Sequence, residues 1–419
     1  MHSKQNPFLK ETTYQKAFFW NMMGSAMNAG ASVIMLMVTT RVAGEVQGGI
    51  FSIGFAIASL MWTLASYETN TFHVTDGKQE YCNENFFHTK VLLCLLTLVV
   101  SIVYVLTRSY DNAKAMAAIL LCLYKIIDAF SGFFYGAFQK AKRLDISGFS
   151  YFMRVLLSIL LFCLGIALTK DLVVAVLLSC LMELIWILAY EVPKGRFLMS
   201  YRSRVQWKQI GRILIQCFPL FCASFILMYI VNIPKYAIDR LWTEEIQNAF
   251  GIIFMPAAVI NLLGIFIFRP LLTTLVECWT KGNLKKLFVL CGRCFALVFV
   301  FTIVCVGAAY TIGIPVLEFL YGVPLAPYRG ALLVVMVAGG FYACISFLYN
   351  ILVVARKQQW ILAAYVPTLL IALGIADTLV GQYEIMGASL VYLCSVGLIF
   401  ILLTILIVVI MVQKRRAIR

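Results

Sequence analysis

Charged residues are scarce in this chain. Only 13% of its 419 residues are Asp, Glu, Lys or Arg, whereas 62% are hydrophobic and the mean hydropathy is +0.92. An ordinary soluble domain carries about 25% charged residues, which cover its surface. Long polar segments are also missing: apolar runs of about 20 residues recur along the whole chain and leave no room for a soluble domain of roughly 50 residues. The composition therefore excludes a soluble protein and predicts an all-α polytopic membrane protein.

Residue patterns typical of catalysis or cofactor binding are missing as well. The three histidines, His2, His73 and His88, lack the spacing of metal ligands, and no nucleotide-binding loop or catalytic-triad motif occurs. The net charge of +15 raises the question of a nucleic-acid partner, but no segment resembles a nucleic-acid-binding module. We therefore predict a protein that is not an enzyme, holds no metal or cofactor and binds no nucleic acid.

Twelve apolar segments are long enough to cross a membrane. We identified them in windows of about 20 residues, the length of helix that spans the hydrocarbon core. An even number of spans places both chain termini on the same side of the membrane. The predicted spans are 17–40, 48–67, 91–107, 115–138, 151–169, 172–192, 213–233, 247–268, 288–312, 330–354, 360–380 and 386–412.

The basic residues are distributed unevenly between the two sides of these spans. On the side of the termini lie 26 Lys and Arg residues, and seven lie on the opposite side, with Lys125 left inside the membrane. Loops rich in Lys and Arg stay in the cytoplasm, where they also contact anionic membrane lipids. We therefore predict a multi-pass protein of the cytoplasmic (inner) cell membrane with both termini in the cytoplasm.

A basic loop at the middle of the chain separates the spans into two equal sets. This loop, PKGRFLMSYRSRVQWKQIGR at 193–212, has six predicted spans on each side. Six spans plus six in the same orientation indicate a parallel repeat related by an axis along the membrane normal, with a cavity between two lobes. We predict an N-terminal lobe over residues 1–200 and a C-terminal lobe over residues 201–419.

Three charged residues, Lys125, Asp128 and Glu183, lie deep inside predicted spans. Lys125 and Asp128 are three residues apart in the span 115–138, so a helix presents both on one face. Lys125 lies about ten residues from either end, roughly 15 Å of helix, too far for its ammonium to reach the headgroups. A lysine at that depth costs about 3 kcal/mol on insertion scales and requires a partner. Glu183 has no cation within one turn of its own helix, so it is predicted to be a lone carboxyl that exchanges a proton or packs neutrally between helices.

Four motifs, in order along the chain, carry a family resemblance. They are TTRVAGEVQGGIFSIGFAIASL from Thr39, YKIIDAFSGFFYGAFQKAKRLDISGFSYFMR from Tyr124, PLFCASFILMYIVNIPKYAID from Pro219 and GIPVLEFLYG from Gly313. On these motifs, and over essentially its whole length, the chain resembles the Wzx-type polysaccharide flippases of the multidrug/oligosaccharidyl-lipid/polysaccharide exporter superfamily.

The resemblance implies about 12 transmembrane helices in two six-helix lobes that form a V and open alternately inward and outward. It implies ion-coupled transport of a polyprenyl-pyrophosphate-linked oligosaccharide from the inner to the outer leaflet, for capsule, O-antigen or other lipopolysaccharide synthesis. The polyprenyl tail can stay in lipid while the sugar and pyrophosphate cross a polar cavity, where cations offset the phosphate charge. Expected partners are this lipid-linked oligosaccharide, membrane lipids, and the polysaccharide polymerase and chain-length machinery.

Under this resemblance the charges inside the spans gain candidate roles. Lys125 and Asp128 would face the cavity and meet the pyrophosphate or take part in ion coupling. The structural alternative is an internal ion pair that locks the fourth helix against a neighbour. Glu183 and Asp128 are the ion-coupling candidates.

Further candidates for the cavity lie nearer the ends of the spans. Arg154 and Arg269 are candidates for phosphate contact, because a planar guanidinium binds phosphate through two hydrogen bonds, although both also stand where basic residues favour the cytoplasmic side. Arg41 is either a cavity residue or an interfacial anchor. Lys235 and Asp239 follow from the third motif, and Asp239 is alternatively a solvated loop charge.

Two other functions fit part of the pattern. A multidrug cation antiporter shares the superfamily fold, but its cavity favours acidic residues, whereas this chain offers Arg41, Lys125 and Arg154. A membrane-embedded glycan polymerase or ligase would share the lipid-linked substrate. Such enzymes typically hold donor and acceptor in a large external loop, and this sequence has only short external segments.

Overall fold

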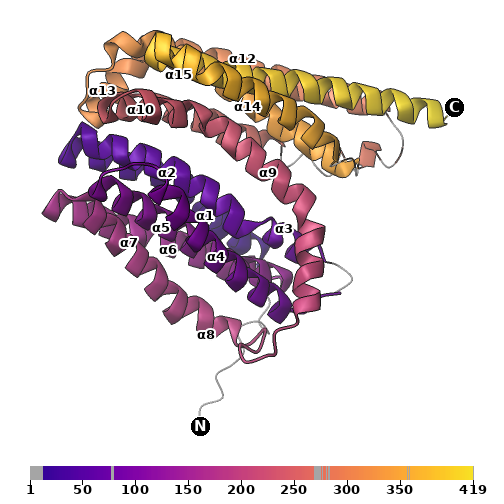
Figure 1. Cartoon of the computed structure of the whole chain (residues 1–419). Coiled ribbons are helices and arrows are strands. Elements are labelled where there is room, and N and C mark those ends of the chain that lie inside the picture. The colour runs from indigo at the N-terminus through magenta and orange to yellow at the C-terminus, as the bar shows by residue number, and fades with distance from the viewer. Residues whose placement is uncertain are drawn as a thin grey trace. The chain divides into compact units, whose positions relative to one another are not determined.

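The chain is helical throughout the part that the computed structural model describes. These residues are 13–76, 80–268, 275, 277–279, 281, 284–355, 357 and 359–418, and none of them lies in a β-strand (Figure 1). The chain divides into two compact units, Met1–Phe221 and Cys222–Arg419. The all-α class predicted from the composition is confirmed.

The N-terminal unit consists of long helices joined by short turns. Aspartates cap two of them: the Asp111 carboxylate accepts hydrogen bonds from the backbone N–H groups of Ala113 and Lys114, and Asp171 accepts one from Val173. The helices are α1 (Tyr14–Ala43), α2 (Glu45–Ser66), α3 (Thr69–Thr75), α4 (Asn83–Leu106), α5 (Asn112–Lys140), α6 (Leu144–Thr169), α7 (Leu172–Trp186), a π-helical turn (Ile187–Glu191) and α8 (Val192–Gly195).

The C-terminal unit has the same character. Helix α9 (Trp207–Leu241) begins in the N-terminal unit and continues into this one. The remaining helices are α10 (Glu244–Phe268), α12 (Leu284–Ala308), a π-helical turn (Ala309–Gly313), α13 (Ile314–Tyr321), a 3₁₀ turn (Ala326–Tyr328), α14 (Arg329–Val354) and α15 (Gln359–Ile418).

Each predicted span lies on one of these helices, and the helices extend up to eight residues beyond the predicted ends. Helix α15 contains two predicted spans, 360–380 and 386–412, and its backbone leaves the helical conformation at Glu384, which has φ 47° and ψ −125°. Ten helical segments among the described residues are long and apolar enough to cross a membrane, with α15 counted once and α10 not included. The twelve predicted spans are reached when α15 is counted as two spans, divided at Glu384, and α10 is added.

In the N-terminal unit the helices pack as pairs around a common interior. Helix α1 lies against α6, α2 against α5, and α5 and α6 both contact α7. Helices α1 and α6 approach each other closely at Gly148, where a Cβ atom would lie 2.5 Å from the backbone of Trp20 and Asn21. Any side chain at position 148 would push these two helices apart. The resulting interior is bordered by α5, α6 and α7, which carry the predicted ionisable residues.

The first half of α9 belongs to the N-terminal unit through its packing. Ile213 and Cys217 are buried in an aromatic cluster with Phe133, Phe134 and other residues of α5. One turn further on, the ring of Phe221 stacks on Tyr67 with 4.2 Å between the ring centroids. These contacts explain why the unit boundary falls within a continuous helix.

In the C-terminal unit α14 is the central helix. It contacts α15, α10 and α12 along its length. Helix α12 is less buried than α14. Only 22% of an apolar stretch within the span Lys286–Tyr321 is buried. Much of the apolar surface of α12 is therefore exposed.

Candidate functional site

The buried charges of the N-terminal unit meet between three helices. Arg154 projects from α6 between Asp128 of α5 and Glu183 of α7, and its side chain is 0% exposed. Its Nη1 lies 2.7 Å from Oε2 of Glu183, and its Nη2 donates to Oδ1 of Asp128. A single guanidinium therefore holds two carboxylates from different helices.

The third nitrogen of the same guanidinium is also engaged. Nε of Arg154 donates to the hydroxyl of Tyr135 over 3.0 Å. The rings of Tyr135 and Tyr151 each have their centroid 5.7 Å from the guanidinium carbon. A phosphate could reach Arg154 only after these contacts had opened, because protein groups already surround the guanidinium.

Two predictions about these charges require correction. Glu183 is not a lone carboxyl, because Arg154 of the neighbouring helix supplies a cation that its own helix lacks. The predicted internal ion pair that locks the fourth span to a neighbour exists, but the partner of Asp128 is Arg154 and not Lys125. In both cases the pairing runs between helices, whereas the sequence reading considered charges on one helix.

A third buried carboxylate, Glu191, joins this region through hydroxyl groups. It is 0% exposed and accepts hydrogen bonds from Ser131 of α5 and from Ser150 of α6, each with an oxygen–oxygen distance of 2.7 Å. The indole N–H of Trp186 donates to Ser150 over 3.0 Å. Among the described residues, no cation lies within ion-pair distance of Glu191. Helices α5 to α7 thus enclose three carboxyl groups and one guanidinium.

The π-helical turn explains why Glu191 faces inward. Eight residues along a regular α-helix would rotate Glu191 by about 80° from Glu183. A π-helical turn takes up one extra residue, which brings the rotation back to about 20°. The turn Ile187–Glu191 therefore aligns both carboxyl groups on the face of α7 that meets α5 and α6. Sequence reasoning missed Glu191 because it placed this residue at the end of a regular span.

Lys125 lies half-buried on α5 against aromatic rings. Its ammonium is 4.8 Å from the ring centroid of Phe55 on α2 and 5.7 Å from that of Tyr124. Within the described part of the chain, no carboxylate lies within ion-pair distance of it. The two ring faces stabilise the ammonium through their quadrupoles, but the ammonium can still bind an anion.

Lys235 is the corresponding feature of the C-terminal unit. It is only 6% exposed on α9, and its ammonium lies 4.9 Å from the ring centroid of Phe254 on α10. No acidic side chain of the described ranges forms an ion pair with it. A buried ammonium without a carboxylate is costly unless an anion or water reaches it.

Arg41, Asp239 and Arg269 are the other predicted cavity residues. Arg41 is exposed in the last turn of α1, and Asp239 is partly exposed near the end of α9. Arg269 lies outside the described residues. No group of three or more His, Cys, Asp or Glu residues suited to a metal ion occurs in the described ranges.

Lys90 is a buried cation that the sequence did not reveal. Lys90, counted among the basic residues on the side of the termini, is 1% exposed on α4. Its ammonium donates to the backbone carbonyl oxygens of Ala65 over 3.3 Å and of Ser66 over 3.1 Å. These carbonyls belong to the last turn of α2, where the helix dipole favours a positive charge. The role of Lys90 is therefore structural.

Comparison with known proteins identifies the fold. No family model matches the chain. The inward-facing structure of a multidrug resistance MATE family transporter of the MOP superfamily has a TM-score of 0.70 at 12% identity, covering 94% of this chain and 99% of that one. The eukaryotic MATE transporter AtDTX14 gives 0.65 at 14% identity over 98% of both chains. A mutant of the MATE transporter VcmN from Vibrio cholerae gives 0.65 at 12% identity over 97% of both.

These likenesses show that the chain has the fold of MATE transporters, which confirms the predicted fold class, and that it is a multi-pass membrane protein. One relative differs in its described role. The capsular polysaccharide biosynthesis protein CapF of Staphylococcus aureus is 21% identical over 282 residues, which are 65% of this chain and 69% of that protein.

Proposed function

We propose that the chain moves a polyprenyl-pyrophosphate-linked oligosaccharide from the inner to the outer leaflet of the cytoplasmic membrane for cell-surface polysaccharide synthesis. The observation that carries this proposal is the similarity to the capsular polysaccharide biosynthesis protein, which extends over 282 residues. The fold alone supports transport without specifying the cargo, because the similar solved structures are multidrug transporters.

The buried charges support an anionic cargo. Asp128 and Glu183 are engaged by Arg154, so they offer no open carboxylate to an organic cation. Lys125 and Lys235 lie against aromatic rings with no carboxylate partner in the described ranges. In this proposal each ammonium group is, by itself, a candidate to meet the pyrophosphate, whose charge offsets the cost of holding it in apolar surroundings.

The same cluster supports coupling to protons. Asp128 and Glu183 share the guanidinium of Arg154, and Glu191 lies between the same helices, bonded to the hydroxyls of Ser131 and Ser150, so the cluster carries excess negative charge when all three are ionised. A proton taken up by one of them removes part of this excess and weakens its hold on the guanidinium. We propose that this step links the ion gradient to movements of α5, α6 and α7.

The remaining features follow the charge distribution. The excess of basic residues on the side of the termini supports cytoplasmic N- and C-termini. An exported repeat unit must be joined to others outside, so we propose a polysaccharide polymerase and its chain-length machinery as partners.

Transport in proteoliposomes tests the proposal. The full chain would be reconstituted with a labelled polyprenyl-pyrophosphate oligosaccharide, and its appearance in the outer leaflet followed with an impermeant glycan-cleaving enzyme. We expect protein-dependent flipping that increases with a proton gradient. Protein-free vesicles and the Lys125→Ala variant serve as controls. Flipping at the protein-free rate would refute the proposed cargo. Flipping at the same rate with and without a proton gradient would refute the proposed proton coupling.

Export of multidrug cations is the second candidate function. The likeness to the inward-facing structure favours it, because that protein is a multidrug resistance transporter. The same vesicles, loaded with a fluorescent organic cation instead of the lipid, distinguish the two. Gradient-driven cation movement without lipid flipping would favour this candidate.

A further inference from the structure

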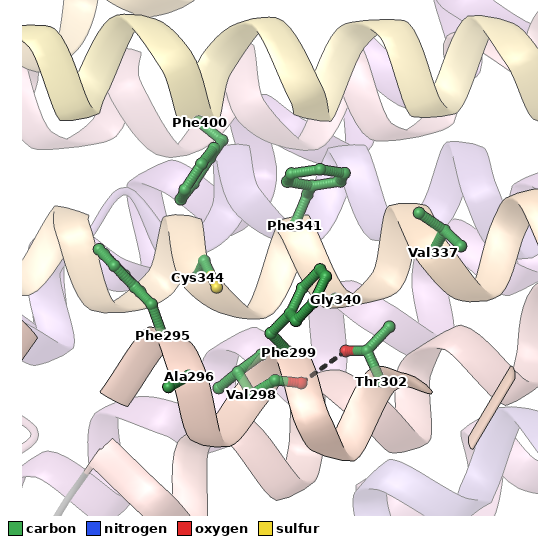
Figure 2. A pocket seen from close by; sticks show the side chains of 10 residues that line it. All are labelled: Phe295, Ala296, Val298, Phe299, Thr302, Val337, Gly340, Phe341, Cys344 and Phe400. Carbon is green, nitrogen blue, oxygen red and sulfur yellow. Dashed lines mark hydrogen bonds between the residues drawn. The ribbon is translucent and has the colours of Figure 1, made fainter. Parts of the chain in front are cut away.

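An apolar groove runs between three helices of the C-terminal unit. It lies between α12, α14 and α15 and encloses about 410 Å³ (Figure 2). Four phenylalanine rings from these helices point toward it: Phe295 and Phe299 of α12, Phe341 of α14 and Phe400 of α15.

One end of the groove lies where two helices approach each other closely. Gly340 of α14 meets Thr302 of α12 so closely that a Cβ atom at position 340 would overlap Oγ1 of Thr302. The lining of the groove extends along α12 from Thr302 to Phe295. The hydroxyl of Thr302 donates to the carbonyl oxygen of Val298 over 2.7 Å, so it presents no free donor to an occupant.

The aromatic wall of the groove is held by ring contacts. The ring of Phe400 lies 5.7 Å from that of Phe295 and 5.4 Å from that of Phe341. Contacts of this kind fix ring orientation and make a preformed surface. On the open side, Phe299 is 66% exposed. In a bilayer such an open apolar groove is filled by a hydrocarbon chain.

A positive charge stands next to this groove. Ala296 lines it, and Arg293 is the neighbour of Ala296 one turn earlier on the surface of α12. Arg293 is exposed, and it lies toward the helix end that the basic-residue count places at the cytoplasmic face. From Arg293 to Thr302 the helix rises about 13 Å, a length that accommodates a few isoprene units. The arrangement suits a phosphate bound at Arg293 with its hydrocarbon tail in the groove.

We infer that this groove binds the phosphate-proximal isoprene units of the polyprenyl pyrophosphate cargo. The inference rests on the proposed function, because that function supplies the polyprenyl tail. Transfer of a tail from lipid to a protein groove brings no hydrophobic gain, so selectivity must come from shape and from the phosphate. A methyl-branched polyprenyl chain is thicker than a straight acyl chain and fills a space bordered by four rings more completely. Its pyrophosphate also has more negative charge than the single phosphate of a membrane phospholipid and is therefore attracted more strongly to Arg293.

Photocrosslinking tests this site directly. The full chain in lipid nanodiscs would be exposed to a polyprenyl pyrophosphate with a diazirine on an isoprene unit near its phosphates, and labelled peptides mapped by mass spectrometry. We expect labels on α12, α14 and α15 around the groove.

Ala296→Trp places an indole in the groove and should lower the yield of crosslinked protein about ten-fold. Leu297→Trp is the matched control, since Leu297 is the next residue, 56% exposed and not part of the lining, and its yield should stay unchanged. Arg293→Gln should lower the yield severalfold.

Each contrary result has a distinct meaning. Equal yields for Ala296→Trp and Leu297→Trp would overturn the inference. So would equal labelling by a phosphatidylglycerol probe with an acyl diazirine, since the groove would then hold membrane lipid. Crosslinking measures binding without transport, so the two proposals are tested separately. Intact flipping without labelling of the groove would refute only the binding of the polyprenyl tail in the groove. Labelling of the groove without flipping would refute only the proposed function.

Discussion

Nη1 of Arg154 on α6 lies 2.7 Å from Oε2 of Glu183 on α7, with both side chains almost completely buried. Burying two charges costs several kcal/mol each, and their attraction compensates only while both partners remain. The pair therefore specifies how α6 and α7 meet more than it adds net stability. Because the same guanidinium also holds Asp128, loss of the arginine would leave two carboxylates without a cation.

Replacement of Arg154 by Gln should strongly destabilise the N-terminal unit. Removing one partner of a buried ion pair typically costs about 3–5 kcal/mol. We expect a clear fall in the midpoint of thermal unfolding in detergent. Arg240→Gln is the matched control, because its partner Asp377 is 58% exposed and such surface pairs contribute about 1 kcal/mol or less. Equal midpoints for the two variants would show that the buried pair does not hold the helices.

Replacement of Lys125 by Ala should abolish flipping while the protein still inserts and accumulates. The lysine has no carboxylate partner among the described residues, so its loss leaves no charge uncompensated. In the proposed role, the substitution removes a cation that meets the pyrophosphate. The measurement is the flipping rate per inserted protein, compared with Lys208→Ala at an exposed position of α9. Normal flipping by the Lys125 variant would exclude this role.

Replacement of Glu183 by Gln should uncouple transport from the proton gradient. The amide has nearly the shape of the carboxyl group but cannot exchange a proton, and Arg154 keeps Asp128 as its counterion. We expect downhill flipping to continue and its stimulation by the gradient to disappear. The stimulation factor, measured in proteoliposomes with and without the gradient, checks this. Ser179→Ala, at a buried position of α7, is the control and should remain stimulated. A Glu183 variant with unchanged stimulation would place the coupling elsewhere.

The spans were predictable because the bilayer imposes a length on every apolar run. Even the division of α15 was visible, since the break at Glu384 falls between the predicted spans 360–380 and 386–412. Helix ends were less predictable. Helix α6 begins at Leu144 and α9 at Trp207, both earlier than the apolar runs, because helices continue into the polar region where hydropathy carries no signal.

The partners of the charges were beyond the reach of sequence reasoning. Asp128 and Glu183 were visible as costly residues, but their common partner Arg154 stands on a third helix and was interpreted as a candidate for phosphate contact near the end of its span. Only the packing of α5, α6 and α7 brings the three together. Glu191 was missed because a π-helical turn has no residue signature and changes the phase of everything after it.

Replacement of Lys90 by Met should destabilise the N-terminal unit without a specific effect on transport. The ammonium donates to the carbonyls of Ala65 and Ser66 in the last turn of α2, and Met fills similar space without a donor. A charge at a partly buried helix end contributes up to about 2 kcal/mol, and uncapped carbonyls add a desolvation cost. We expect a lower unfolding midpoint for Lys90→Met and a smaller change for Lys90→Arg, which keeps a positive donor. The flipping rate per folded molecule should be unchanged, because these carbonyls lie outside the charge cluster of Arg154. If Lys90→Met keeps the wild-type midpoint but loses transport, the lysine serves the cargo rather than α2.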